Sequence, residues 1–165
     1  MVYRRRSIRL KGYEYSQSGY YFVTLCTYNR EKLLGRIKNE RMRLNSMGKI
    51  VNEIWESISK HHAVGLDAFQ IMPNHIHFIV VLKPGGLNIK GGSRPAPTLG
   101  MIVGFLKSES TKRINKSVWA TRGSPGIWQR NYFEHIIRNE QEYWTIKKYI
   151  QDNPKNWEED EMYGE

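Results

Sequence analysis

Apolar and polar residues alternate along the chain with two different periods, and each period predicts one kind of element. Runs rich in β-branched and aromatic residues predict strands at 20–27, 66–72, 75–82 and 127–137, with a hairpin at 33–37 and 41–44. Helical spacing predicts amphipathic helices from Asn45 or Ser46 to His61–His62, from Thr98 toward Ile114, and over 140–152. Pro154 ends the last helix, because the residue before a proline is disfavoured in the α region.

This order of elements predicts the class of fold. Strands that follow one another closely pair in antiparallel fashion, and the helices between them cover the sheet. We therefore expect an α+β fold in a single domain. It consists of an antiparallel sheet of the ferredoxin or RRM type with helices packed mainly on one face. The length of 165 residues suits one such domain.

The predicted domain spans 20–157, with a basic segment before it, a loop within it and an acidic segment after it. Residues 1–19 are basic and polar and are expected to form an arm on the surface or on a ligand. Residues 84–97 are rich in glycine and proline, which predicts a mobile loop. Residues 158–165 form an acidic tail, which either screens a site or has no role.

The charge of the chain indicates an anionic partner. The net charge is +10, and the acidic tail contributes five negative charges and no positive one, so the rest of the chain carries +15. Such a basic body attracts a polyanion through the release of counterions. The five Trp, ten Tyr and five Phe residues offer stacking surfaces for unpaired bases, although aromatic residues also build ordinary cores.

The sequence shows no sign of a membrane or export segment. No window approaches the roughly 20 apolar residues of a membrane span, and no apolar segment follows the basic start. We therefore expect a cytoplasmic, nucleoid-associated protein with no membrane partner. Cys26 is the only cysteine and lies within an apolar run, so it is expected to be a small buried residue rather than a nucleophile.

Two histidines form the most informative local pattern. His75 and His77 are two residues apart in a predicted strand, so both imidazoles point to one face while Ile76 and Phe78 point into the core. Two imidazoles a few Å apart on one face make a natural pair of metal ligands. The spacing alone also fits two histidines that a strand exposes without any role.

A second pattern lies at the end of the last predicted helix. Tyr149 and Asn153 are four residues apart and therefore share a helix face. A tyrosine hydroxyl, with a pKa of roughly 10, is a poor nucleophile unless a metal activates its target or cations favour the phenolate. The carbonyl oxygen of Asn153 could complete a metal site with the two histidines. The same two residues also fit simple packing and helix termination.

The run Met-Pro-Asn-His-Ile-His at 72–77 resembles the HUH motif, histidine-hydrophobic-histidine, of the single-tyrosine transposases. Its flanks resemble the branch of that family associated with repetitive extragenic palindromes (REPs). The similar flanks are residues 5–13, 21–27 and 128–138, then Tyr149-Ile150 and Asn153-Pro154. The resemblance extends from residue 4 to about residue 157. Several separated motifs in the same order are more specific than the histidine pair alone.

This resemblance implies an activity and a set of site residues. The protein would be a transposase, a single-stranded DNA endonuclease and strand transferase that cuts hairpin-flanked sites through a 5′-phosphotyrosine. Tyr149 matches the nucleophile, while His75, His77 and Asn153 match the ligands of a divalent metal, Mg²⁺ or Mn²⁺. Two imidazoles also suit Zn²⁺, so the metal stays open. The candidate DNA contacts in the arm are Arg4, Arg5, Arg6, Arg9 and Lys11.

Several other functions remain open at this point. A non-catalytic nucleic-acid-binding module would bind DNA without forming a covalent product. A metal-dependent phosphodiesterase would use water and would not need Tyr149. A replication-initiation nuclease or a domesticated transposase would use the same chemistry for another purpose. The sequence also leaves open whether the protein is a monomer or a homodimer.

Overall fold

The computed structural model describes residues 19–83, 88–89, 92–93, 96–117, 126–160 and 162–163. Four strands form an antiparallel sheet in the order β4-β5-β1-β8. They are β1 (Gly19–Cys26), β4 (Val64–Ile71), β5 (His75–Leu82) and β8 (Phe133–Ile137). With α1 (Ser46–His61) and α2 (Leu99–Ser117), the chain runs β1-α1-β4-β5-α2-β8. This is the βαββαβ order of ferredoxin-like folds, which confirms the predicted class.

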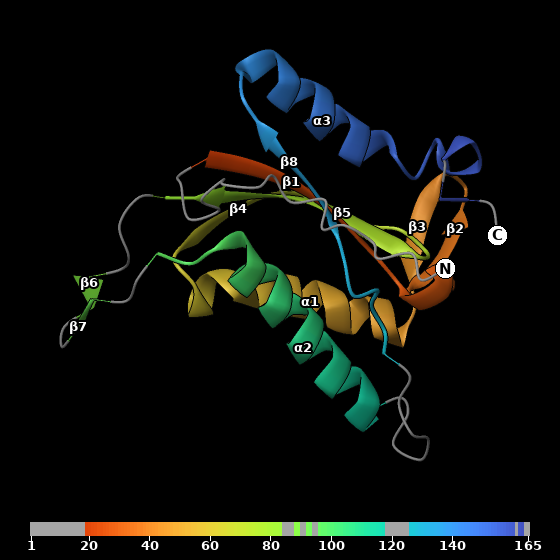
Figure 1. Ribbon diagram of the computed structural model, residues 1–165. Coiled ribbons are helices and arrows are strands. Elements are labelled where there is room, and N and C mark those ends of the chain that lie inside the picture. The colour runs from red at the N-terminus through yellow and green to blue at the C-terminus, as the bar shows by residue number, and fades with distance from the viewer. Residues whose placement is uncertain are drawn as a thin grey trace, which may run out of the picture.

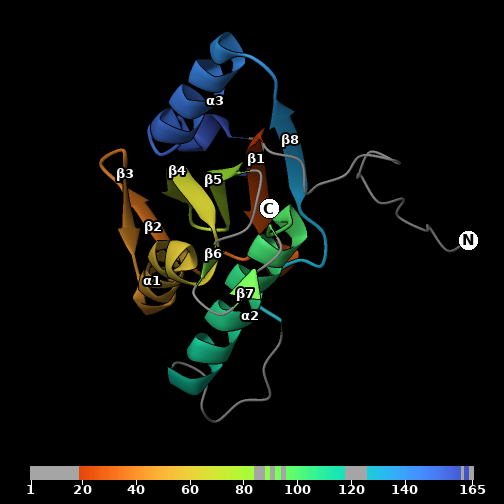
Figure 2. The same ribbon diagram turned by 90° about the vertical axis from the view of Figure 1, so that its left-hand side faces the viewer.

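The helices divide between the two faces of the sheet. The helices α1 and α2 lie side by side on one face, as predicted, whereas α3 (Glu140–Asp152) crosses the opposite face (Figures 1 and 2). The main apolar cluster lies between the sheet and the α1–α2 pair. A smaller cluster, formed by Phe22, Ala68, Ile79, Ile137 and Ile150, lies under α3. The third helix thus covers a face that would otherwise be open.

Polar contacts hold α3 across the sheet. Its first turn is capped by Asn139, whose side chain accepts a hydrogen bond from the backbone N–H of Glu142. Further along, Tyr143 donates to Asp67 of β4 at 2.6 Å, and the Lys147 ammonium lies 2.8 Å from the same carboxylate. Burial opposes ionisation of Asp67, but the hydrogen bonds from Lys147 and Tyr143 keep its pKa below the usual value. These contacts fix the helix that carries Tyr149.

A two-stranded ribbon lies at one end of the sheet (Figure 1). The strands β2 (Gly35–Lys38) and β3 (Arg41–Leu44) pair as an antiparallel ribbon, as predicted. The 3₁₀ turns η1 (Tyr28–Arg30) and η2 (Trp157–Glu159) follow β1 and α3. Gly48 of α1 faces the carbonyl oxygen of Leu34, 2.2 Å from where a Cβ would lie, so only glycine allows this close approach.

Three sequence predictions fall partly or wholly outside the described residues. The basic arm, predicted over 1–19, lies outside them except for Gly19, which begins β1. Within 84–97, the two-residue strands β6 (Asn88–Ile89) and β7 (Gly92–Ser93) pair, so this segment is not wholly irregular; its expected mobility stays a prediction. The expected bounds of the arm, domain and tail also stay predictions. Among the described residues, no helix is long and apolar enough to cross a membrane.

The last strand is shorter than the predicted run of 127–137. Regular pairing with β1 begins at Phe133, and before it only Trp128 forms an isolated bridge, with Thr27. The intervening carbonyl groups of Gln129 and Arg130 accept hydrogen bonds from the Lys107 ammonium instead of joining the ladder. A cation on α2 therefore replaces the sheet as their partner.

Candidate metal and nucleophile site

The two histidines of β5 lie together on the face of the sheet that α3 covers. Their Nε2 atoms are 3.0 Å apart, and the exposed fractions are 0% for His75 and 2% for His77. The alternate residues Ile76 and Phe78 point to the main core on the other face, as the strand period predicts. Two buried imidazoles with converging Nε2 atoms form a preorganised pair of ligand atoms.

An amide behind His75 determines which ring nitrogen faces the site. The Nδ1 atom of His75 lies 2.8 Å from Oδ1 of Asn74, and the Asn74 amide nitrogen donates to the backbone oxygen of Met162 at 2.8 Å. Because that donation assigns the amide's orientation, Nδ1 of His75 must carry the proton and donate. The lone pair of the neutral ring is therefore on Nε2, which faces His77.

A hydroxyl holds the ring of His77 from behind, and it can either donate to or accept from this imidazole. Its Nδ1 atom lies 2.8 Å from Oγ1 of Thr24 on β1, which pairs with His77 in the sheet register. The ring also rests on Phe22, with ring centroids 5.5 Å apart. Partners of this kind orient metal-binding histidines.

Burial keeps both imidazoles neutral. It lowers the pKa of His75 to about 4, although the carboxylate of Asp160 and the amide of Asn153 act in the opposite direction. Burial also holds the pKa of His77 well below its usual value, and the neighbouring His75 adds to this effect. Neutral imidazoles have lone pairs available for a metal ion at neutral pH.

The helix α3 brings the predicted nucleophile to this pair. The hydroxyl of Tyr149 lies 3.4 Å from Nε2 of His77, and its ring meets Phe22 edge-on at 6.2 Å between centroids. The side chain is 47% exposed, so one side of the phenol faces solvent. Sheet and helix thus bring together residues that are 72 positions apart in the chain.

Asn153 lies at the C-cap of α3, beside the histidines, and is 3% exposed. Its amide nitrogen donates to Oδ2 of Asp160 at 2.8 Å. Its Oδ1 atom is buried and has no hydrogen-bond partner in the described part of the chain. A buried amide oxygen without a donor is costly unless something else, such as a cation, satisfies it.

Asp160 joins the site although sequence reasoning placed it in the acidic tail. Its Oδ2 atom lies 3.9 Å from Nε2 of His75, and ligand atoms of His75, His77 and Asp160 all lie within 4.8 Å of one another. Its Oδ1 atom accepts from the backbone N–H of Met162 at 2.7 Å. The tail is held here by Trp157, whose ring lies 5.9 Å from that of His75.

The donor set fits a divalent metal ion. The two Nε2 atoms, the unsatisfied oxygen of Asn153 and the carboxylate of Asp160 converge beside a hollow of about 350 Å³. Tyr149 lines the same hollow. Adding a carboxylate and an amide oxygen to two imidazoles favours Mg²⁺ or Mn²⁺ more than the histidine pair alone does.

The remaining candidate residues lie elsewhere. The predicted DNA contacts Arg4, Arg5, Arg6, Arg9 and Lys11 all fall outside the described residues. His135 pairs with Glu142 at 2.6 Å and takes no part in the cluster. Cys26 is half-buried rather than a full core residue, and lies 3.9 Å from the sulfur of Met162. Burial raises the pKa of its thiol, which makes it a weak nucleophile.

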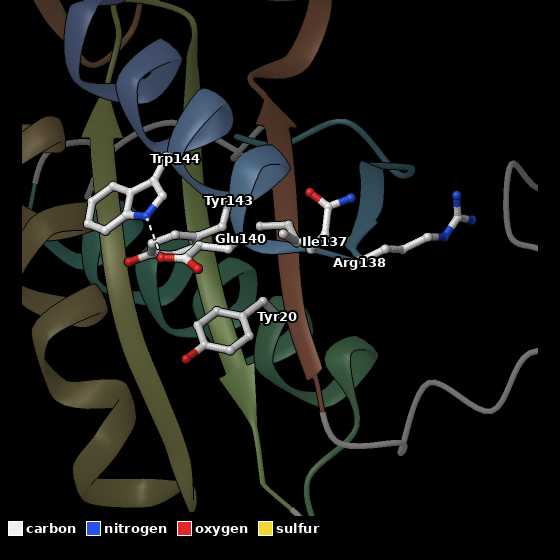
Figure 3. Close-up of a pocket in the computed structure, with 7 residues that line it drawn as sticks. Tyr20, Ile137, Arg138, Glu140, Tyr143 and Trp144 are labelled. Atoms are coloured by element: carbon white, nitrogen blue, oxygen red, sulfur yellow. Dashed lines mark hydrogen bonds between the residues drawn. The ribbon is translucent and has the colours of Figure 1, made fainter.

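A second hollow, of about 440 Å³, lies near the other end of α3. Figure 3 shows Tyr20, Tyr143 and Trp144 around it, with the indole nitrogen of Trp144 donating to Glu140. None of the candidate metal ligands lines it. The candidate metal ligands therefore lie at the hollow beside Tyr149 and not at this aromatic one.

The sequence that forms this fold and this site matches the model of a transposase family. The family model described as "Transposase IS200 like" matches residues 15–153, which include the histidine pair, Tyr149 and Asn153. The chain belongs to this family. The match covers most of the chain and agrees with the resemblance found in the sequence.

Two relatives from Haemophilus influenzae extend the comparison. The first, an uncharacterized protein, is 41% identical over 179 residues, which cover 98% of this chain and 94% of the relative. The second, named "Putative REP-associated tyrosine transposase", is 24% identical over 151 residues, covering 86% of this chain and 73% of the relative. The recognition of this family from the sequence is confirmed.

Two solved structures share the fold. One is a REP-associated tyrosine transposase bound to a REP hairpin, with a TM-score of 0.61 and 21% identity over 95% of this chain and 74% of that one. The other is described as "a putative transposase" from Deinococcus radiodurans, with a TM-score of 0.53 and 17% identity over 87% of this chain and 95% of that one. At these identities the likeness concerns the fold.

Proposed function

We propose that the protein is a metal-dependent tyrosine nuclease and strand transferase that acts on single-stranded DNA beside a hairpin. One observation carries this proposal. The Tyr149 hydroxyl lies 3.4 Å from Nε2 of the buried His77, which belongs to the candidate metal cluster of His75, His77 and Asp160. The hairpin substrate is supported by the related fold solved with a REP hairpin and by the +10 net charge of this chain.

The proposed reaction exchanges one phosphodiester for another. The phenol oxygen of Tyr149 attacks phosphorus, and the bond from phosphorus to the 3′ oxygen of the preceding nucleotide breaks. That oxygen takes a proton from water and becomes a 3′-hydroxyl. The phenol loses its proton to the solvent on its exposed side. The 5′-phosphotyrosine keeps the energy of the original ester, so a 3′-hydroxyl can reverse the step and join strands without ATP.

The residues of the chain have separate roles in this proposal. His75, His77, Asn153 and Asp160 would hold the metal, which when bound polarises the phosphate and offsets the charge that builds on its oxygens. Asn74 and Thr24 position the two imidazoles through their Nδ1 atoms. Phe22 positions both His77 and Tyr149, because its ring contacts each of them.

The other candidate functions do not explain why these features occur together. A binding module has no need of a tyrosine hydroxyl beside neutral, buried histidines. A nuclease that uses water would leave Tyr149 without a role in the hollow it lines. The proposal therefore assigns catalysis to Tyr149 and metal binding to the cluster behind it.

A denaturing gel tests the proposal. Labelled single-stranded DNA carrying the palindromic flanks of the protein's own gene is incubated with the protein and Mg²⁺ or Mn²⁺. We expect a covalent protein–DNA adduct that chelator removes, with the DNA mapped by mass spectrometry to the peptide containing Tyr149. Cleavage without any adduct would support the water-using nuclease, and binding without cleavage would support the binding module.

Asp160→Asn is expected to weaken Mn²⁺ binding at least tenfold. The substitution keeps the size of the side chain but removes the charge nearest His75, and changes beside metal sites cost roughly 10- to 100-fold in affinity. Isothermal titration calorimetry measures the effect. The matched control is Asp152→Asn, since Asp152 pairs with Lys148 and Lys155 instead. Equal Mn²⁺ affinity in both variants would remove Asp160 from the ligand set.

A further inference from the structure

The β2–β3 ribbon carries positive charge on one side. Residues alternate across a strand, so one side of the ribbon holds the half-buried Ile37 and Met42, and Met42 packs against the main core. The other side holds four exposed basic residues that face one another in register. The cross-strand pairs are Arg36 with Arg43 and Lys38 with Arg41.

This arrangement does not help the chain to fold. Directly opposed residues have Cβ atoms about 5 Å apart, and like charges at that distance destabilise a sheet. Within the described part of the chain, no carboxylate forms an ion pair with any of the four side chains. No ion pair in that part of the chain offsets this repulsion, and the carboxylates nearest to hand, those of Glu40, Glu158 and Glu159, line the hollow beside Arg36 without pairing with it. A polyanion on the exposed side of the ribbon would offset the repulsion.

The backbone fixes the shape of this charged surface. The turn residues Asn39 and Glu40 have φ values of 53° and 58°, the positive pair that a tight two-residue hairpin turn requires. At the other end, Gly35 has φ of 146°, and a Cβ there would lie 2.2 Å from the carbonyl oxygen of Arg43. The four cations are thus held on a rigid support before any ligand arrives.

The ribbon is next to the candidate catalytic hollow. A hollow of about 520 Å³ is lined on one side by residues 35–37 and on the other by Pro154–Glu159, the segment between Asn153 and Asp160. Asn156 and Glu159 line both this hollow and the one at Tyr149. Figure 1 shows β2 and β3 beside the end of the chain that follows α3.

We propose that the cationic face of the β2–β3 ribbon binds the phosphate backbone of the duplex stem of the DNA hairpin. The adjoining single strand then lies in the hollow at Tyr149. A two-stranded ribbon matches the width of a duplex groove. Residues 35–44 include no aromatic side chain, so this face lacks the stacking surfaces that unpaired bases require. The proposal rests on the proposed function for its DNA substrate.

The test compares two double variants that lose the same charge. Arg36→Gln with Arg43→Gln removes one cross-strand pair. Lys60→Gln with Lys116→Gln removes two exposed cations from α1 and α2, which lie on the face of the sheet opposite to α3 and Tyr149. Fluorescence anisotropy measures binding of a hairpin and of an unpaired oligonucleotide of equal length over a salt series, with chelator present to prevent cleavage.

For the ribbon variant we expect hairpin affinity to fall about tenfold and the slope of log K against log salt to decrease by about 1 to 2. The unpaired oligonucleotide and the control variant should change less than twofold. Thermal unfolding should show unchanged or higher stability, because a repulsive pair is gone. An unchanged slope, or equal losses on both DNAs, would overturn the proposal. Because no cleavage is measured, its failure is distinct from that of the tyrosine chemistry.

Discussion

Tyr149→Phe is expected to abolish the covalent protein–DNA adduct and to lower strand cleavage by at least about a thousandfold. The substitution removes only the hydroxyl, and an enzyme that loses its covalent nucleophile keeps only what binding and electrostatics supply. The aromatic contact with Phe22 should survive, because it does not use the hydroxyl. Single-turnover assays on a hairpin-flanked strand, read on a denaturing gel, measure both quantities.

The matched control for this prediction is Tyr28→Phe. Tyr28 is 48% exposed, nearly the same as the 47% of Tyr149, but lies in η1 rather than on α3. It should keep full activity. If the adduct persists in the Tyr149 variant, another tyrosine is the nucleophile. If cleavage persists without an adduct, the reaction uses water.

Replacing either histidine by alanine is expected to lower Mn²⁺ affinity by at least about a hundredfold and to remove cleavage with it. Each variant deletes one of two converging Nε2 atoms, which leaves a single imidazole beside the oxygens of Asn153 and Asp160. DNA binding in the presence of chelator should persist, since phosphate contacts do not need these rings. Calorimetry with Mn²⁺ and the hairpin anisotropy assay measure the two effects separately.

His135→Ala serves as the control for the histidine variants. His135 pairs with Glu142 and lies outside the cluster, so its loss should leave Mn²⁺ affinity unchanged. Circular dichroism checks that each variant is folded, which matters because His75 and His77 are buried. Wild-type Mn²⁺ affinity in a folded His77→Ala variant would contradict the proposed site.

Local patterns predicted the elements that hold the histidines and the tyrosine. The strand β5 runs over His75–Leu82 as its β-branched and aromatic residues predict, and Pro73 separates it from the preceding run. Asn45 caps α1, and α3 covers Glu140–Asp152 as expected. In each case the signal lies within a few neighbouring residues, where periodicity and capping act.

The features that the sequence did not predict depend on contacts between residues that are far apart in the sequence. The apolar stripe of α3, including Ile146 and Ile150, indicates a buried helix face but not which face of the sheet it covers. The position of Asp160 depends on hydrogen bonds from Asn153 and Met162, which hold its carboxylate near His75. The acidic tail has no hydrophobic periodicity from which this position could be predicted. The late start of β8 depends on Lys107, a cation on another element.

The order of elements along the chain decides when the protein becomes competent during its synthesis. The sheet that holds His75 and His77 is complete at Ile137, whereas Tyr149 and Asp160 follow it. A domain folds as a unit, and the segment that carries Tyr149 and Asp160 is the last part of this one to be made. By the proposed chemistry, a ribosome-bound chain cannot cut DNA until α3 has emerged and docked across the open face.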